Sequence, residues 1–287
     1  MQRAVRAARN PHHATRILVT EMNRIEAKFK ELKKRKDKAL IAYITVGYPS
    51  LAMTEKLIIA LERSKVDIIE LGVPFSDPLA DGPTIQKASE SALKKGVKLA
   101  DAFGIVRSIR KISDIPIAFM LYYNIILRRG IESFVRECAT SGVDGIIVPD
   151  LPLEEADPLI QSSRRQGVAT ILLAAPTSTK DRIRRIARSS TGFVYYVSVT
   201  GVTGARRRLP PNLIAEVRAV KASVKKPMCV GFGVSSPDQA RALSAAADGV
   251  IVGSALIRTI ERNIDKRDLP ERVSRFARTL AKAVHRD

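Results

Sequence analysis

Short apolar runs alternate with amphipathic stretches along the chain from residue 39 onward. The runs are almost continuously hydrophobic and do not alternate with polar residues, which is typical of strands buried on both faces of a parallel sheet. Such runs occupy residues 39–47, 66–73, 115–123, 144–150, 168–176, 193–200, 227–233 and 248–254. They predict eight strands.

The segments between these runs have the residue spacing of amphipathic helices, at 53–64, 101–112, 130–141, 154–166, 180–189, 212–223 and 236–246. Eight strands with intervening helices in about 245 residues are typical of a (β/α)8 barrel. We therefore predict an α/β fold of the TIM-barrel class, with an N-terminal helix and a short extra helix after the eighth strand. A doubly wound open sheet is the second choice, but it usually has a Gly-rich fingerprint after its first strand, where VGYPSLAMT stands here.

The N-terminus divides into two parts. Residues 1–21 carry four arginines and no acidic residue before Glu21, as in a transit peptide or an upstream extension of the reading frame. After Met22 the chain has a helical pattern with Ile25, Phe29 and Leu32 on one side. We expect residues 22–287 to form a single catalytic barrel domain. Residues 1–21 are expected to be a poorly ordered or mis-started extension that adds little to the core.

Composition narrows the class of protein. Hydrophobic residues make up 45% of the 287, enough for a sizeable core, and two cysteines exclude a disulfide-dense scaffold or a multi-cysteine zinc site. The longest stretch without a charge, residues 189–205, is rich in Gly, Ser and Thr and is unlike a membrane span. We expect a cytoplasmic protein without a metal site.

The net charge of +20 is unusual, with 49 Lys and Arg residues against 29 Asp and Glu. Such a charge attracts polyanions, including nucleic acid and phosphorylated metabolites. The charges are dispersed over helix faces and aromatic residues are scarce, so a solvated basic surface is favoured over nucleic-acid binding. A noncatalytic nucleic-acid-binding protein remains an alternative.

The second predicted strand and its loop, IIELGVPFSDPLADGPTIQ (68–86), hold the most informative residues. Glu70 lies within an apolar strand, where an isolated charge is costly, and no predicted strand core has a Lys or Arg to pair with it. Asp77 and Asp81 follow in a loop rich in Pro and Gly. Glu70, with a raised pKa, could exchange protons with a substrate while Asp81 stays ionised and holds a donor on it.

Glycines at three strand ends predict a phosphate site. They lie in TGVTGARRRLPP (200–211), GFGVSSPDQA (231–240) and VGSALIRTI (252–260). Glycines let backbone N–H groups approach an anion, and Gly253-Ser254 opens a short helix whose amides would point at a phosphate. Barrels commonly bind phosphate after strands seven and eight. The arginines at 206–208 are either a lid over this end or a solvated charge run.

The stretch from Ile69 to Gly82, IELGVPFSDPLADG, resembles the signature of the tryptophan synthase alpha chain family. AYITVGYPS, LYYN, SVTGVTGAR, GFGVSSPDQ and GSALI follow in the family's order, so the resemblance covers residues 22–287. It implies a lyase that cleaves indole-3-glycerol phosphate to indole and glyceraldehyde 3-phosphate in tryptophan biosynthesis.

The resemblance also implies roles for individual residues. Glu70 corresponds to the general acid/base that moves a proton between the substrate hydroxyl and indole C3, and Asp81 to the carboxylate that binds the indole N–H. The phosphate-binding positions correspond to Gly204, Gly233, Gly253 and Ser254. The apolar wall around the indole corresponds to Tyr43, Met120, Tyr122, Ile147, Tyr195 and Phe232. Tyr43 and Met120 stand where the family often has Phe and Leu, and both keep the bulk.

The family's alpha chain pairs with a beta chain that carries pyridoxal phosphate, in an alpha-beta-beta-alpha heterotetramer, and itself needs no cofactor. Pro74, Asp77 and Pro78 resemble the segment that touches the beta chain. Two other enzymes stay open. One is a stand-alone lyase without a beta chain. The other is another phosphate-binding barrel enzyme of amino-acid biosynthesis, although strands one and five here end without the acidic pair that such isomerases usually have.

Overall fold

The computed structural model describes residues 22–197, 209–231 and 233–285. The predictions for residues 1–21, Gly204, Phe232 and the arginines at 206–208 therefore fall outside the described residues. No helix in the described part of the chain is both long and apolar enough to cross a membrane.

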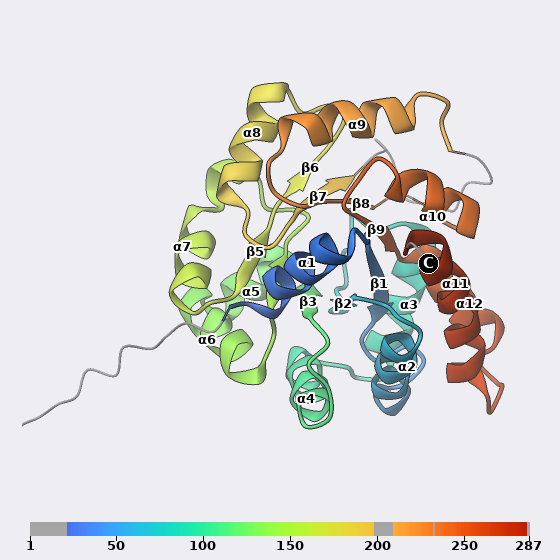
Figure 1. Cartoon of the computed structure of the whole chain (residues 1–287). Coiled ribbons are helices and arrows are strands. Elements are labelled where there is room, and N and C mark those ends of the chain that lie inside the picture. Colours follow the sequence, from blue (N-terminus) through green and yellow to red (C-terminus); the bar gives the residue numbers. More distant parts are fainter. Residues whose placement is uncertain (1–21, 198–208, 232, 286–287) are drawn as a thin grey trace, which may run out of the picture.

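In the described part of the chain, nine parallel strands form one sheet, in the order β5-β4-β3-β2-β1-β9-β8-β7-β6 (Figure 1). They are β1 (Ala39–Thr45), β2 (Ile68–Gly72), β3 (Ile117–Met120), β4 (Gly145–Ile147), β5 (Ala169–Ile171), β6 (Leu173–Ala174), β7 (Val194–Val197), β8 (Met228–Gly231) and β9 (Gly249–Val252). The strands at the two ends of this order, β5 and β6, are separated only by Leu172. The chain itself therefore closes the ring, and the predicted barrel is confirmed.

Each of the eight predicted runs contains a strand, and the run 168–176 contains two short ones. At the break, the Leu172 N–H donates to the Ser190 hydroxyl (3.3 Å) and its carbonyl accepts from the Tyr195 N–H (3.1 Å). Leu172 thus bonds to Tyr195 of β7 and to Ser190, the residue after α8. β5 pairs with β4 and β6 with β7, so this one segment joins the two halves of the barrel.

The helices surround the strand ring (Figure 1). They are α1 (Arg24–Arg35), α2 (Leu51–Arg63), α3 (Pro83–Lys94), α4 (Leu99–Arg110), α5 (Tyr123–Arg129), α6 (Ile131–Ser141), α7 (Asp157–Arg165), α8 (Lys180–Ser189), α9 (Leu213–Ser223), α10 (Pro237–Ser244), α11 (Ser254–Arg262) and α12 (Leu269–Val284), with a 3₁₀ turn at Leu153–Glu155. The seven predicted helices, the N-terminal helix and the extra helix α11 are confirmed. Helices α3, α5 and α12 were not predicted.

Helix α1 closes the N-terminal end of the barrel (Figure 1). Its predicted apolar side, Ile25, Phe29 and Leu32, is buried in the same cluster as the inward-facing strand residues. The Phe29 ring lies 5.7 Å from that of Phe193 at the entry to β7. Helix α1 therefore closes this end of the barrel interior.

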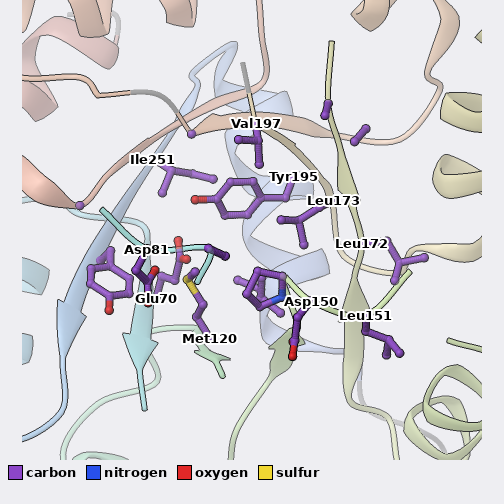
Figure 2. Close-up of a pocket in the computed structure, with 18 of the residues that line it drawn as sticks. Glu70, Asp81, Met120, Asp150, Leu151, Leu172, Leu173, Tyr195, Val197 and Ile251 are labelled. Atoms are coloured by element: carbon purple, nitrogen blue, oxygen red, sulfur yellow. The ribbon is translucent and has the colours of Figure 1, made fainter. Parts of the chain in front are cut away.

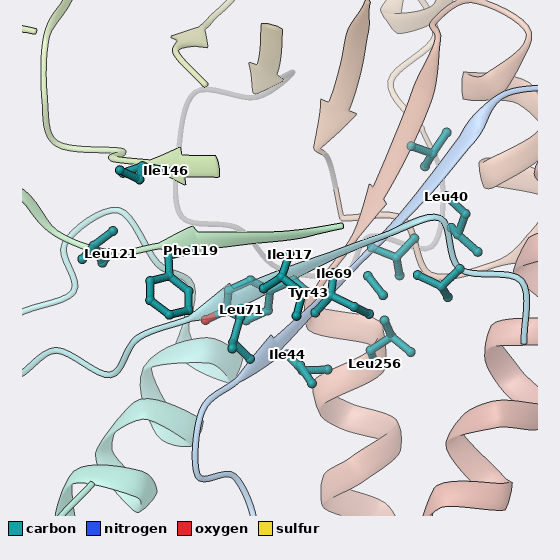
Figure 3. Packing of buried hydrophobic residues seen from close by; sticks show 14 of the residues in the cluster. Leu40, Tyr43, Ile44, Ile69, Leu71, Ile117, Phe119, Leu121, Ile146 and Leu256 are labelled. Carbon is teal, nitrogen blue, oxygen red and sulfur yellow. The ribbon is translucent and has the colours of Figure 1, made fainter. Parts of the chain in front are cut away.

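Successive residues of a strand point to opposite faces, and this places Glu70. In β2, Ile69 and Leu71 pack in the layer between strands and helices, together with Ile44, Phe119 and other residues shown in Figure 3. Ile68 faces the barrel interior with Ile25 and Ile41. Glu70, two residues further along β2, therefore points inward, toward the C-terminal end of the barrel.

Candidate active site

A cavity of about 720 Å³ opens at the C-terminal ends of the strands (Figure 2). This is the end of a barrel at which catalytic residues are expected. The predicted site residues that line it are Tyr43, Glu70, Asp81, Met120, Ile147, Tyr195, Gly233, Gly253 and Ser254. The structure thus brings together residues that are spread over more than two hundred positions of the sequence.

Glu70 is a carboxyl group buried in the cavity. It pairs in register with Tyr43 of β1 and Ala118 of β3, and only 1% of the residue is exposed. Neither carboxyl oxygen has a hydrogen-bond partner among the residues that the structure describes. Burial, and secondarily the negative charge of Asp81, raise the pKa of Glu70 to about 8. The carboxyl is therefore mostly protonated at neutral pH, in a cavity where it can give up that proton.

Asp81 lies at the end of the loop between β2 and α3, beside Glu70 (Figure 2). Its Oδ2 accepts a hydrogen bond of 3.1 Å from the Tyr122 hydroxyl, which in turn accepts one of 3.0 Å from the Ala80 N–H. Burial raises the pKa of Asp81 to about 6, and the bond from Tyr122 opposes that rise. Asp81 therefore stays largely ionised at pH 7, as the sequence predicts for the loop carboxylate.

Tyr122 supports the loop that carries Asp81. It is not among the described residues that line the cavity, and its hydroxyl bonds to Asp81 and Ala80. Its ring stacks on Phe75 at 5.0 Å between centroids. The place of Tyr122 in the apolar wall around an indole stays a prediction.

Two tyrosines form the sides of the cavity by lying over glycines of neighbouring strands. A Cβ atom on Gly72 would lie 2.2 Å from the Tyr43 hydroxyl oxygen, and one on Gly231 would lie 2.5 Å from the Tyr195 ring. No side chain other than hydrogen fits beneath either ring. The Tyr195 ring projects toward Glu70 and Asp81, and Met120 lies beside Glu70 (Figure 2).

Three of the predicted phosphate-binding residues meet on one side of the cavity. Gly233 follows β8 and has a φ of 28°, a value that favours glycine. Gly253 joins β9 to α11, and the buried Ser254 is the first residue of that helix. The first amides of α11 have no partner within the helix, so their N–H groups and the helix dipole favour an anion there.

The predicted partner loop lies on the rim. Pro74 is buried, Pro78 is partly buried and Asp77 is exposed, with its carboxylate accepting a hydrogen bond of 2.5 Å from the Ser76 hydroxyl. The neighbouring Leu79 is 91% exposed although it is apolar and lines the cavity mouth.

Two charged residues of the rim, Asp150 and Arg182, were not predicted from the sequence. Asp150 ends the fourth apolar run, and its carboxylate accepts a hydrogen bond of 2.9 Å from the Tyr123 N–H at the start of α5. Its place after a predicted strand was a usable signal. Arg182 of α8 also lines the rim and binds both oxygens of Glu154, at 2.8 and 2.9 Å. Nothing local in the sequence predicts that pair.

Comparisons with known proteins point in one direction. A family model described as tryptophan synthase alpha chain matches residues 29–285. The tryptophan synthase alpha chain of Geotalea daltonii is 50% identical over 241 residues, which are 84% of this chain and 91% of that protein. That of Thermoanaerobacter sp. (strain X514) is 45% identical over 263 residues, which are 92% of this chain and 100% of that protein.

Solved structures agree. Tryptophan synthase subunit alpha from Legionella pneumophila is 36% identical and superposes with a TM-score of 0.86, covering 92% of this chain and 99% of that one. A chain of Mycobacterium tuberculosis tryptophan synthase is 38% identical with a TM-score of 0.83, covering 93% of this chain and 100% of that one. Among the residues that the structure describes, no group of three His, Cys, Asp or Glu side chains could hold a metal ion.

Proposed function

This chain belongs to the tryptophan synthase alpha chain family, and from that premise we propose how its own residues carry out the reaction. Members of the family are lyases that cleave indole-3-glycerol phosphate in tryptophan biosynthesis. The observation that carries the proposal is the pair of buried carboxyl groups, Glu70 and Asp81, in the cavity that also holds Gly253 and Ser254.

Glu70 is the general acid and base. Its carboxyl is protonated at neutral pH, so it can transfer a proton to indole C3, which leaves a positive charge on the ring nitrogen. The carboxylate so formed then removes the proton of the side-chain hydroxyl. The carbon–oxygen bond of this hydroxyl becomes the aldehyde carbonyl. The bond between indole C3 and the side chain breaks, and its electron pair returns to the ring. Glyceraldehyde 3-phosphate and indole are released, and Glu70 regains its proton.

Asp81 is the electrostatic partner of the ring nitrogen. An ionised carboxylate that accepts the indole N–H stabilises the positive charge that develops there, more strongly in a cavity shielded from water than in solution. The two carboxyl groups divide the work because their environments differ. Glu70 has no hydrogen bond from any described residue, whereas Asp81 accepts one from Tyr122 that keeps its pKa lower.

The two ends of the cavity orient the substrate. The amides of Gly233 and Gly253, with the Ser254 hydroxyl and the start of α11, bind the phosphate. Tyr43, Met120, Ile147 and Tyr195 enclose the indole. Gly204 and Phe232, outside the described residues, complete these two sets. A substrate held at both ends places C3 against Glu70 without further motion of the carboxyl.

The family implies a beta-chain partner. We propose that the rim around Pro74, Asp77 and Pro78 contacts it, in an alpha-beta-beta-alpha heterotetramer in the cytoplasm. Pyridoxal phosphate is then bound by the beta chain and this chain has no cofactor of its own.

Residues 22–287 act as one catalytic domain, with residues 1–21 as an extension that adds little to its core.

Incubation of the purified chain with indole-3-glycerol phosphate, with and without a beta chain, tests the function. We expect release of indole and glyceraldehyde 3-phosphate in equal amounts, accelerated by the beta chain. Full activity alone that a beta chain does not change would instead indicate a stand-alone lyase. Absence of cleavage under both conditions, with a folded protein, would refute the proposed function.

A further inference from the structure

A second concave site lies at the other end of the barrel. A groove of about 640 Å³ runs between α1 and the N-terminal ends of β7, β8, β9 and β1, on the side opposite the active-site cavity. Helix α1 and the residues after it contribute Lys30, Lys33, Lys36 and Lys38 to its lining. The end of α9 and the loop before β8 contribute Lys221, Lys225 and Lys226.

The acidic residues of the groove neutralise only part of this charge. Asp248 pairs with Lys221 at 2.7 Å and with Lys38 at 3.7 Å. Asp37 pairs with Arg35 at 2.9 Å, and Glu26 is the remaining acid of the lining. Seven lysines therefore face three carboxylates, two of which already have cationic partners.

Five lysines of the groove have no carboxylate partner within the described residues. They are Lys30, Lys33, Lys36 and Lys225, which are exposed, and the partly buried Lys226, whose ammonium group donates to the Ser190 carbonyl. They come from segments almost two hundred residues apart, so the fold and not a local charge run brings them together. Like charges gathered in a concave site repel one another, and a multivalent anion removes that repulsion.

We propose that this groove binds a small anion with several phosphoryl groups, such as inorganic tripolyphosphate or the triphosphate of a nucleotide. Lysine ammonium groups bind phosphate as point charges with rotatable donors. The groove has the volume of a small-molecule site and an apolar floor formed by Phe29, Leu32 and Pro227. Nucleic acid is disfavoured because Phe29, the only aromatic residue among the described lining residues, is 8% exposed and offers no ring for stacking bases.

The test is a calorimetric titration of the full chain with tripolyphosphate at physiological salt. Saturating glycerol 3-phosphate is present to occupy the phosphate end of the active-site cavity. Adenosine triphosphate and adenosine are titrated in parallel. Equal affinity for tripolyphosphate and the nucleotide identifies the phosphate chain as the ligand, and tighter binding of the nucleotide identifies its triphosphate as part of a larger ligand.

The variant Lys30→Ala/Lys33→Ala/Lys225→Ala removes three of the unpaired charges. Lys36 is retained because its φ of 58° lies in the left-handed region, so a substitution there would also change the backbone strain. The matched control, Lys56→Ala/Lys111→Ala/Lys282→Ala, removes the same charge from exposed positions elsewhere. We expect about tenfold weaker tripolyphosphate binding in the groove variant, with the control within about twofold of the unmodified chain.

Three results would overturn the proposal. They are no binding by the unmodified chain, an equal loss of affinity in both variants, or single-stranded DNA binding more tightly than tripolyphosphate at equal phosphate concentration. Unchanged lyase activity and circular dichroism in the groove variant exclude misfolding as the cause of weak binding. Because the groove contains none of the proposed catalytic residues, the outcome is independent of the lyase assay.

Discussion

The Tyr122 hydroxyl donates a hydrogen bond of 3.1 Å to Asp81 Oδ2, across 41 positions of the sequence. The Tyr122 hydroxyl oxygen also accepts the Ala80 N–H, so one phenol group fixes both the backbone and the side chain of the loop that carries Asp81. Stacking on Phe75 fixes the phenol in turn. Asp81 is therefore held beside Glu70 by a residue that does not itself line the cavity.

Replacement of this donor, Tyr122→Phe, is expected to raise the pKa of Asp81, since the hydrogen bond now lowers it. The ionised form of Asp81 would then be reached only at higher pH. The acidic limb of the pH profile of kcat/KM should lie near pH 6 in the unmodified chain and move to higher pH in Tyr122→Phe. The loss of activity should therefore be larger at pH 6 than at pH 8. Tyr123→Phe is the control, and an unchanged acidic limb in Tyr122→Phe would show that this bond does not set the ionisation of Asp81.

Glu70→Gln tests the proton transfer itself. The amide has nearly the same shape but cannot give up and regain the proton, so kcat is expected to fall by about 10²–10⁴. Binding of glycerol 3-phosphate should be unchanged, because the phosphate end of the cavity is untouched. Glu90→Gln, on the exposed face of α3, is the control. Cleavage at the normal rate by Glu70→Gln would exclude Glu70 as the acid and base.

The same substitution has a consequence for stability that does not depend on the substrate. The pKa of Glu70 is raised from an ordinary 4.5 to about 8 in the folded protein, so the folded state keeps a proton that the unfolded state releases between these values. Folding is therefore progressively disfavoured from about pH 4.5 to 8, and constant above that. Glu70→Gln removes this effect. The quantity to measure is the free energy of unfolding in urea of Glu70→Gln minus that of the unmodified chain. This difference should be larger at pH 8 than at pH 5, and an equal difference at both pH values would contradict the raised pKa of Glu70.

The barrel could be predicted because each strand is a continuous apolar run, which requires burial on both faces whatever its partners are. Helix α3 was missed because its buried face is Ile85, Ala88, Ser89 and Ala92, a weak apolar pattern. Helix α5 has seven residues, too few for a period to show. The break at Leu172 depends on its hydrogen bonds to Ser190 and Tyr195, which no local pattern contains.

The site was predictable where one residue is chemically out of place. A carboxyl within an apolar strand identifies Glu70 without knowledge of any contact, and no described residue forms a hydrogen bond with either of its oxygens. The place of Tyr122 was not predictable, because the sequence gives its residue type and not its partner. The lysine groove likewise depends on α1 and α9 meeting at one end of the barrel.

Ser254→Ala tests the phosphate end of the cavity. Ser254 begins α11 and is 8% exposed, and loss of a hydroxyl that binds a charged phosphate is expected to raise KM by about tenfold or more. The value of kcat should change little, since the carboxyl pair is unaffected. Thr259→Ala on the same helix is the control, because its hydroxyl donates to the Ala255 carbonyl and not into the cavity. An unchanged KM in Ser254→Ala would remove this serine from the phosphate site.

Gly72→Ala tests whether the wall of the cavity depends on a missing side chain. The added methyl group would lie 2.2 Å from the Tyr43 hydroxyl oxygen, so the ring must move or the strand must shift. Overpacking of this kind costs about 1–3 kcal/mol of stability. Because Tyr43 pairs in register with Glu70, the shift should also lower kcat/KM, by up to about 10²-fold.

Gly104→Ala separates this steric effect from the general effect of replacing a glycine. A Cβ atom on Gly104, within α4, would meet nothing within 4 Å, so the substitution should stabilise the helix by about 0.5–1 kcal/mol and leave kcat/KM unchanged. Thermal unfolding and steady-state kinetics of both variants make the comparison. Opposite signs for the two changes in stability, with loss of activity only in Gly72→Ala, would show that the cavity needs the space beneath Tyr43. Equal behaviour of the two variants would show that Tyr43 can move aside without consequence.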